Sequence, residues 1–111
     1  MVTSEIKLSI PTLKGRFFFS PMEIVRLEAC SNYTIIYFIG NKKILTTKVL
    51  KNYATMLEPL GFVRTHRTHL VNKKYVHSIS GDSIIMEDES VADISRRMKG
   101  NVMKALCHDV A

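Results

Sequence analysis

The segment that decides how this chain is understood reads Phe62-Val63-Arg64-Thr65-His66-Arg67-Thr68-His69-Leu70-Val71-Asn72, and Lys73-Lys74 follow it. Hydrogen-bond donors crowd between its apolar anchors, and it contains no acid. Guanidinium, ammonium, hydroxyl and amide groups are those with which proteins hold phosphates and read base edges. The segment therefore indicates either a donor-rich loop that binds nucleic acid or a basic loop that is only solvated, and the rest of the sequence decides between the two.

The charge of the chain is unevenly distributed along its 111 residues, although the formal net charge is only +6. Residues 29–81 contain eight lysines and arginines against one acid, Glu58, whereas half of the ten acids lie in residues 82–93. A basic block of this kind predicts an electrostatic footprint for an anionic partner.

The bulk composition is that of one folded domain over residues 1–111. Apolar residues make up 46% of the chain, enough for a core, and no apolar run approaches the roughly 20 residues that cross a bilayer. The N-terminal residues lack the layout of a signal peptide. We expect no membrane insertion, a cytoplasmic location, and free thiols at Cys30 and Cys107.

Apolar alternation predicts a mainly β fold of small antiparallel strands. Pro11 should end the first strand, and Arg26 and Glu28 should face solvent from the third. The expected strands are Ile6–Ile10, Arg16–Phe19, Ile24–Glu28, Tyr33–Ile39, Lys43–Thr47, Tyr75–Ile79, Ser83–Met86 and Ser90–Ile94.

Two segments have helical rather than alternating periodicity. Residues Val49–Leu57 predict one short internal helix, which the proline and glycine that follow should end. Its buried stripe should consist of Val49, Leu50, Tyr53, Met56 and Leu57. A C-terminal helix should be capped by Ser95 and bury Met98, Val102 and Leu106.

Common catalytic and metal-binding patterns are missing from the sequence, so we expect no enzyme and no cofactor. His66 and His69 could join Cys30 at a metal, but no further thiol or carboxylate lies nearby, which favours a structural or DNA-facing role. Helix-turn-helix and zinc-finger patterns are also absent. DNA would have to be read by loops or strands.

Four blocks of the chain resemble the LytTR-type DNA-binding domain of bacterial LytR/AlgR-like response regulators. Residues Ile24–Thr34 are similar to the family's I-x-x-I/L-E-A-x-x-N-Y pattern, and residues Phe62–Asn72 to its F-x-R-x-H-R-S-x-x-V-N signature. Residues Leu50–Leu57 and Ile94–Arg97 match its first helix and the start of its last helix. The match covers about residues 20–106.

The resemblance implies a transcription regulator that binds specific double-stranded DNA sequences, with loops between strands entering successive major grooves. Carried over to this sequence, the residues expected to contact bases are Tyr33 or Asn32 in the first turn, Arg67 in the signature and Arg96 at the last helix. The resemblance also implies directly repeated sites occupied by two copies, as a homodimer on DNA.

Other residues of these blocks have supporting roles in this interpretation. His66 and Asn72 are expected to brace the loop by hydrogen bonds, and Lys73, Lys74 and Arg97 to contact phosphates, which position the protein without reading sequence.

Two questions stay open at the level of sequence. Family members usually carry a receiver domain that residues 1–20 cannot form, so the chain is either a stand-alone regulator or part of a longer one. The alternative function is a non-catalytic interaction module that contacts a regulatory or membrane protein through its acidic residues 82–93. RNA binding ranks third, because no exposed aromatic pair suited to base stacking is evident.

Overall fold

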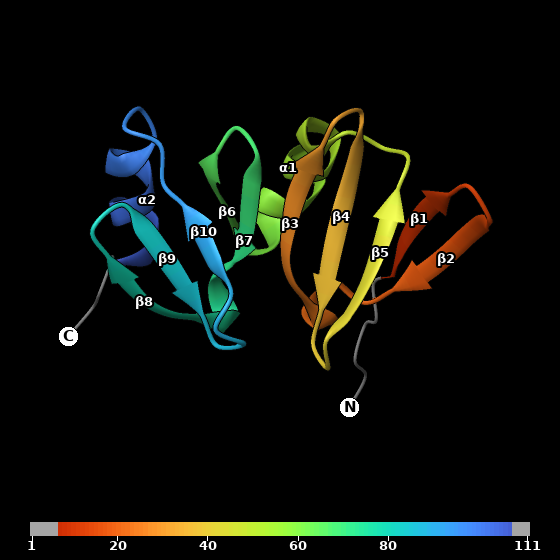
Figure 1. Cartoon of the computed structure of the whole chain (residues 1–111), viewed down its shortest axis with the longest axis horizontal. Helices are drawn as coiled ribbons and strands as arrows, with labels where there is room; N and C mark the ends of the chain where they lie inside the picture. Colours follow the sequence, from red (N-terminus) through yellow and green to blue (C-terminus); the bar gives the residue numbers. More distant parts are fainter. Residues whose placement is uncertain (1–6, 108–111) are drawn as a thin grey trace.

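Three antiparallel sheets form the framework of the computed structural model, which describes residues 7–107 (Figure 1). The largest sheet has five strands in the order β5-β4-β3-β7-β6. Its strands are β3 (Ile24–Cys30), β4 (Tyr33–Phe38), β5 (Lys42–Thr46), β6 (Phe62–His66) and β7 (His69–Asn72). The position of β3 at the centre means that both of its faces can be covered.

Smaller sheets flank the large one at opposite ends of the molecule (Figure 1). One is a ribbon, and the other has three strands in the order β10-β9-β8. The ribbon consists of β1 (Leu8–Thr12) and β2 (Gly15–Phe19), and the three-stranded sheet of β8 (Val76–Ser80), β9 (Ser83–Met86) and β10 (Val91–Asp93). The helices are α1 (Leu50–Leu57) and α2 (Lys99–Leu106), with short 3-10 turns η1 (Pro21–Glu23), η2 (Glu58–Leu60) and η3 (Lys73–Tyr75).

Two apolar clusters stabilise this arrangement, one on each face of the large sheet. The first packs α1 and the ribbon against one face through residues such as Tyr53, Leu57 and Ile10. The second packs β8–β10 and α2 against the other face around Val71. Burying an aliphatic side chain contributes about 1.5–3 kcal/mol, so both clusters fix how the strands and helices sit.

The structure confirms the mainly β class, the short internal helix and the C-terminal helix. The expected apolar residues of α2 do pack against the second cluster, with Val102 fully buried. The stripe predicted for α1 is partly wrong, because Val49 and Met56 are exposed and Ala54 is buried in their place. The expected strand over residues 6–10 is shifted, because β1 runs from Leu8 to Thr12 and residue 6 lies outside the described residues.

Two further predictions about strands were wrong. Pro11 does not end β1; it pairs with Arg16 inside the ribbon, where a strand edge tolerates the missing N–H. Arg26 does not face solvent, because it shares a sheet face with Val71, which the three-stranded sheet covers. Its guanidinium is satisfied there: Nε donates to Ser90 Oγ at 3.0 Å, and Nη1 donates to Glu28 Oε1 at 3.0 Å.

The donor-rich segment Phe62–Asn72 is not a loop but the hairpin β6–β7, with its turn at Arg67 and Thr68. The alternation of apolar and polar residues that would indicate β6 is not visible in the sequence, because a register shift between Arg64 and His66 interrupts it. The donors of the segment are therefore carried on a rigid element.

Candidate nucleic-acid interface

Three connections lie along one edge of the molecule, at the top of Figure 1. They are the β3–β4 turn, the β6–β7 turn and the connection from β10 to α2, and the first turn of α1 lies between them. Because each connection follows a strand or begins a helix, its side chains project from a fixed backbone.

Hydrogen bonds between these connections hold them in one arrangement. The Ala29 N–H, near the end of β3, donates to the Thr68 carbonyl at 2.9 Å, and the Ser95 N–H donates to the Thr65 carbonyl at 2.8 Å. The Thr34 hydroxyl donates to the Lys48 carbonyl at 2.8 Å, which joins β4 to the start of α1. The edge is thus one connected unit and not a set of independent loops.

The β6–β7 turn presents Arg67 to solvent and is braced from within. The Arg64 guanidinium donates to the His66 carbonyl at 3.0 Å and to the Arg67 carbonyl at 2.6 Å. Arg67 itself is exposed, and its side chain makes no hydrogen bond or ion pair with any residue from 7 to 107. The guanidinium of Arg67 is therefore free to bind a ligand from a fixed position.

His66 lies within this brace. Its Nδ1 accepts from the Thr68 N–H at 3.1 Å and lies 2.8 Å from the Thr68 hydroxyl. Because a backbone N–H can only donate, Nδ1 is the acceptor in its contact with the Thr68 N–H. The His66 ring therefore closes the turn from within.

Asn72 is buried at the other end of β7. Its amide donates to the Ile24 carbonyl at 2.9 Å and accepts from the Lys74 N–H at 3.0 Å. Both polar ends of the amide are thereby satisfied, as a buried amide requires. Asn72 fixes β7 to the start of β3, so it braces the base of the hairpin and not the turn.

His69 lies behind the turn, with its ring 5.7 Å from the ring of His66. Its Nδ1 is buried and has no hydrogen-bond partner among the described residues. Burial lowers the pKa of His69 below its usual value, and the nearby carboxylate of Glu28 opposes this only in part. The imidazole is therefore kept neutral at pH 7.

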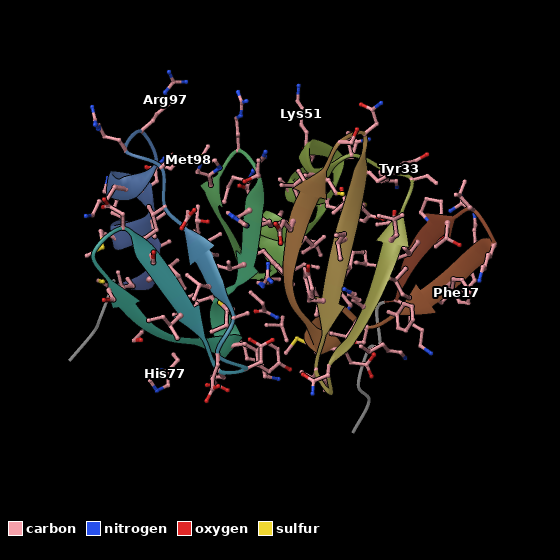
Figure 2. All side chains as sticks on the ribbon, in the orientation of Figure 1. Phe17, Tyr33, Lys51, His77, Arg97 and Met98 are labelled. Atoms are coloured by element: carbon pink, nitrogen blue, oxygen red, sulfur yellow. The ribbon has the colours of Figure 1, made fainter. Side chains whose placement is uncertain are left out.

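Arg97 shares a hollow of about 490 Å³ with Arg67, and Ser95 and Met98 line it as well. Figure 2 shows Arg97 projecting from the upper edge, above Met98. Arg96 is exposed on the same turn, but it does not line the hollow. The structure thus brings Arg97, which was expected only at a phosphate, next to Arg67.

The start of the last helix also differs from expectation. Ser95 does accept from the Met98 N–H with its hydroxyl, at 3.2 Å, but α2 begins only at Lys99. Residues 96–98 form a turn, because the bonds from Met98 to Ser95 and from Lys99 to Arg96 span three residues. Both arginines are therefore on a turn and not on the first turn of the helix.

Asn32 lies in the β3–β4 turn and Tyr33 is the first residue of β4, and both are exposed. Ser31 has a φ of 57°, in the left-handed region, which lets β3 reverse within two residues. Figure 2 places Tyr33 near the same edge as Arg97, and Lys51 projects from that edge between them. Sequence reasoning missed Lys51, whose position as an exposed residue in the first turn of a helix gave no sign of which edge it joins.

Lys73 and Lys74 are not brought to this edge. They follow the last residue of β7 and lie in η3, at the end of the hairpin opposite to the Arg67 turn (Figure 1). The Lys73 N–H donates to the Gly61 carbonyl, next to the start of β6, at 3.0 Å. Phosphate contact by these two lysines stays a prediction, and it would need DNA to reach the other end of the molecule.

The acidic residues 82–93 are spread over separate elements. Asp82 lies in the β8–β9 turn and pairs with Lys99 at 2.8 Å, whereas Asp88 in the β9–β10 turn accepts from the Ser90 hydroxyl at 2.5 Å. Among residues 7–107, no group of three His, Cys, Asp or Glu side chains is placed to hold a metal ion.

Comparison with known families identifies the domain. The sequence profile of the LytTr DNA-binding domain matches residues 14–107 of this chain. The chain belongs to the LytTR family. This family consists of DNA-binding and not catalytic domains, so the LytTR domain described above is a DNA-binding domain of bacterial transcription regulators.

A solved structure agrees with the fold of this LytTR domain. A LytTr DNA-binding domain from Bacillus cereus matches it with a TM-score of 0.78 and 18% sequence identity, over 94% of this chain and 98% of that one. No curated protein matches the sequence. Within residues 7–107, neither helix is long and apolar enough to cross a membrane.

Proposed function

We propose that this LytTR domain is a transcription regulator without catalytic activity that reads specific double-stranded DNA sequences in the major groove. The three connections of the upper edge would enter the groove in place of a recognition helix. Major-groove edges distinguish all four base pairs, and an arginine fork binds O6 and N7 of guanine.

The observation that carries this proposal is the placement of Arg67. An exposed guanidinium without internal partners sits on a turn whose carbonyls are held by Arg64. A side chain that reads a base must be free, and the backbone below it must be fixed. The β6–β7 turn has both properties.

We assign the roles along the edge as follows. Arg67 and Arg97 contact neighbouring bases because they share one hollow. Arg96 contacts a base or phosphate beside them, and Tyr33, with Asn32, reads the adjoining groove segment. Lys51 contacts a phosphate between these two groups. Two copies bind directly repeated sites as a homodimer on DNA, and the regulator acts in the cytoplasm.

The experiment begins with selection of binding sites from a random duplex library. Arg67→Ala should then weaken binding to the selected site by about 1–3 kcal/mol and leave most non-specific binding intact. Lys104→Ala, on the exposed face of α2, serves as the control for the loss of one positive charge. Equal weakening by Arg67→Ala on every sequence would restrict Arg67 to phosphate contact, and failure to select any site would refute sequence-specific reading.

Lys51→Ala provides an independent check on the geometry of the edge. Removing one phosphate contact should lower the slope of log K against log salt concentration by about one unit, without a change in site preference. An unchanged slope would remove Lys51 from the interface.

A further inference from the structure

The turn of the β1–β2 ribbon lies at the same end of the five-stranded sheet as the β3–β4 turn. Thr34, near the start of β4, pairs with Thr46, the last residue of β5. The next residue, Thr47, donates its N–H to the Pro11 carbonyl near the end of β1 at 3.0 Å, and its hydroxyl donates to the same carbonyl at 3.4 Å. These bonds fasten the ribbon to the upper edge, and the ribbon turn lies beyond the β3–β4 turn on the side away from α2 (Figure 1).

Lys14 in the ribbon turn is close to Tyr33, which we assign to the DNA-reading surface. Both residues line one hollow of about 380 Å³ between the ribbon and β5, together with mostly apolar side chains. Figure 2 shows Tyr33 between Lys51 and the ribbon that carries Phe17. Lys51, Tyr33 and the ribbon turn thus follow one another, with Arg97 at the opposite end of the edge.

The backbone of the ribbon turn is fixed by its own hydrogen bonds. The Thr12 hydroxyl donates to the Gly15 carbonyl at 2.8 Å and accepts from the Lys14 N–H at 3.1 Å. Arg16 is held on the ribbon, because its guanidinium donates to Ser9 Oγ at 2.8 Å. The Lys14 ammonium, by contrast, is exposed and makes no hydrogen bond or ion pair within residues 7–107. Lys14 is therefore a free cation on a fixed backbone.

The charge around Lys14 favours an anionic partner. Residues 7–19 and 39–57, which include the ribbon, β5 and α1, contain no acid. Lys48 and Lys51 in the second range lie at the same end of the sheet as Lys14, since the Thr34 hydroxyl donates to the Lys48 carbonyl. A line of cations without acids between them suits a phosphate backbone. The mostly apolar hollow is unsuited to a phosphate, so the contact falls to Lys14 at its rim.

We propose that Lys14 contacts a DNA phosphate outside the base pairs that the upper edge reads, so that the ribbon extends the interface along one flank of the site. This inference rests on the proposed DNA function and adds a contact that the three connections do not make. The ribbon lies beyond Tyr33 on the side away from Arg97, so only one flank is touched. A phosphate contact adds affinity without reading sequence. The domain therefore needs a longer duplex on its Tyr33 side than its base contacts require.

The test compares duplexes that carry the selected site with long flanks or with one flank trimmed to the last selected base pair. Loss of base preference in Arg97→Ala identifies the end of the site at which Arg97 lies, and the opposite flank is the one trimmed. The unmodified chain should bind the long duplex more tightly than the trimmed one, whereas Lys14→Ala should bind both equally. Lys14→Arg keeps the charge and should behave as the unmodified chain. Lys43→Ala removes an exposed lysine near the other end of β5, so it is the matched control.

The salt dependence of binding gives the magnitude. Loss of one phosphate contact should lower the slope of log K against log salt concentration by about 0.9. The affinity of the unmodified chain relative to Lys14→Ala on the long duplex should therefore be about 3.5 times larger at ~50 mM salt than at ~200 mM. Lys43→Ala should leave the slope unchanged.

An unchanged slope in Lys14→Ala would overturn the proposal. So would the absence of any loss on trimming in the unmodified chain, or an equal loss in Lys14→Ala. An equal fall in slope in Lys43→Ala would show that only net charge matters, which also overturns it. Failure of the DNA-reading proposal is a different outcome, the absence of a selected site, and the salt slopes on an unselected duplex would then still test Lys14. Equal thermal midpoints of all variants exclude unfolding as the cause.

Discussion

Replacement of Arg64 with methionine should weaken DNA binding although Arg64 is not expected to touch DNA. Methionine keeps the apolar stem but removes the donors to the His66 and Arg67 carbonyls. Hydrogen bonds from charged donors contribute about 1.5–3 kcal/mol each, but water can replace the guanidinium at this partly exposed turn. We expect a loss of about 1–2 kcal/mol in the free energy of unfolding, measured by urea denaturation.

Arg64→Met should also weaken binding, because the β6–β7 turn loses the two hydrogen bonds that fix its backbone. Ordering the backbone of one residue costs about 1–2 kcal/mol, and DNA would have to order this turn again. The selected site should therefore bind about 5- to 30-fold more weakly, since about 1.4 kcal/mol corresponds to a tenfold change. Fluorescence anisotropy of a labelled duplex measures this directly.

Arg64→Lys tests the reasoning, because lysine keeps the charge but cannot reproduce the fork that reaches both carbonyls. It should lose nearly as much affinity as methionine. Full affinity in the lysine variant would show that Arg64 acts through its charge. Unchanged stability and affinity in both variants would refute the bracing role.

Three further outcomes follow from buried and exposed polar groups. Asn72→Ala should lower the free energy of unfolding by about 1–3 kcal/mol, because the Ile24 carbonyl loses its donor; a smaller change in urea denaturation would count against the brace. Burial lowers the pKa of His69 from 6.5, so the unfolded chain binds a proton that the folded chain does not, and stability should fall as pH drops below about 6.5. His69→Leu should lose this part of the pH dependence, and parallel pH profiles of the two proteins would contradict it. Asp82→Asn should leave the Tm unchanged at ~150 mM salt, because the Lys99 pair is exposed and screened, and a clear drop in the thermal midpoint would refute this.

Sequence periodicity identified most of the strands and both helices because local patterning dominates them. Tyr33–Phe38 and Leu50–Leu57 are examples in which the apolar residues alone indicate the element. The errors arose where tertiary contacts override local pattern. Arg26 looks like a solvent-facing residue in its own strand, and only the covering of that face by a distant sheet buries it.

In the candidate site, too, local sequence identified single residues, whereas their arrangement depends on tertiary structure. The sequence singled out Arg67 because donors crowd around it, but it could not show which connections share an edge. Lys74 is nearer to Arg67 in sequence than Lys51 is, yet the length of β7 separates Lys74 from the turn. Spatial proximity here depends on strand direction and sheet order, which a single sequence does not reveal.

The hydrogen bonds that hold the upper edge together run through the backbone or through the side chains of Thr34, Arg64, Thr65 and His66. The side chains of Arg67 and Arg97 take no part in them within residues 7–107. Under the proposed function, stability and target choice are thus carried by different residues. We then expect that a mutation of Arg67 or Arg97 redirects the domain to another promoter without unfolding it. Duplicated copies of such a gene could therefore acquire new targets through single substitutions, each passing through a folded protein.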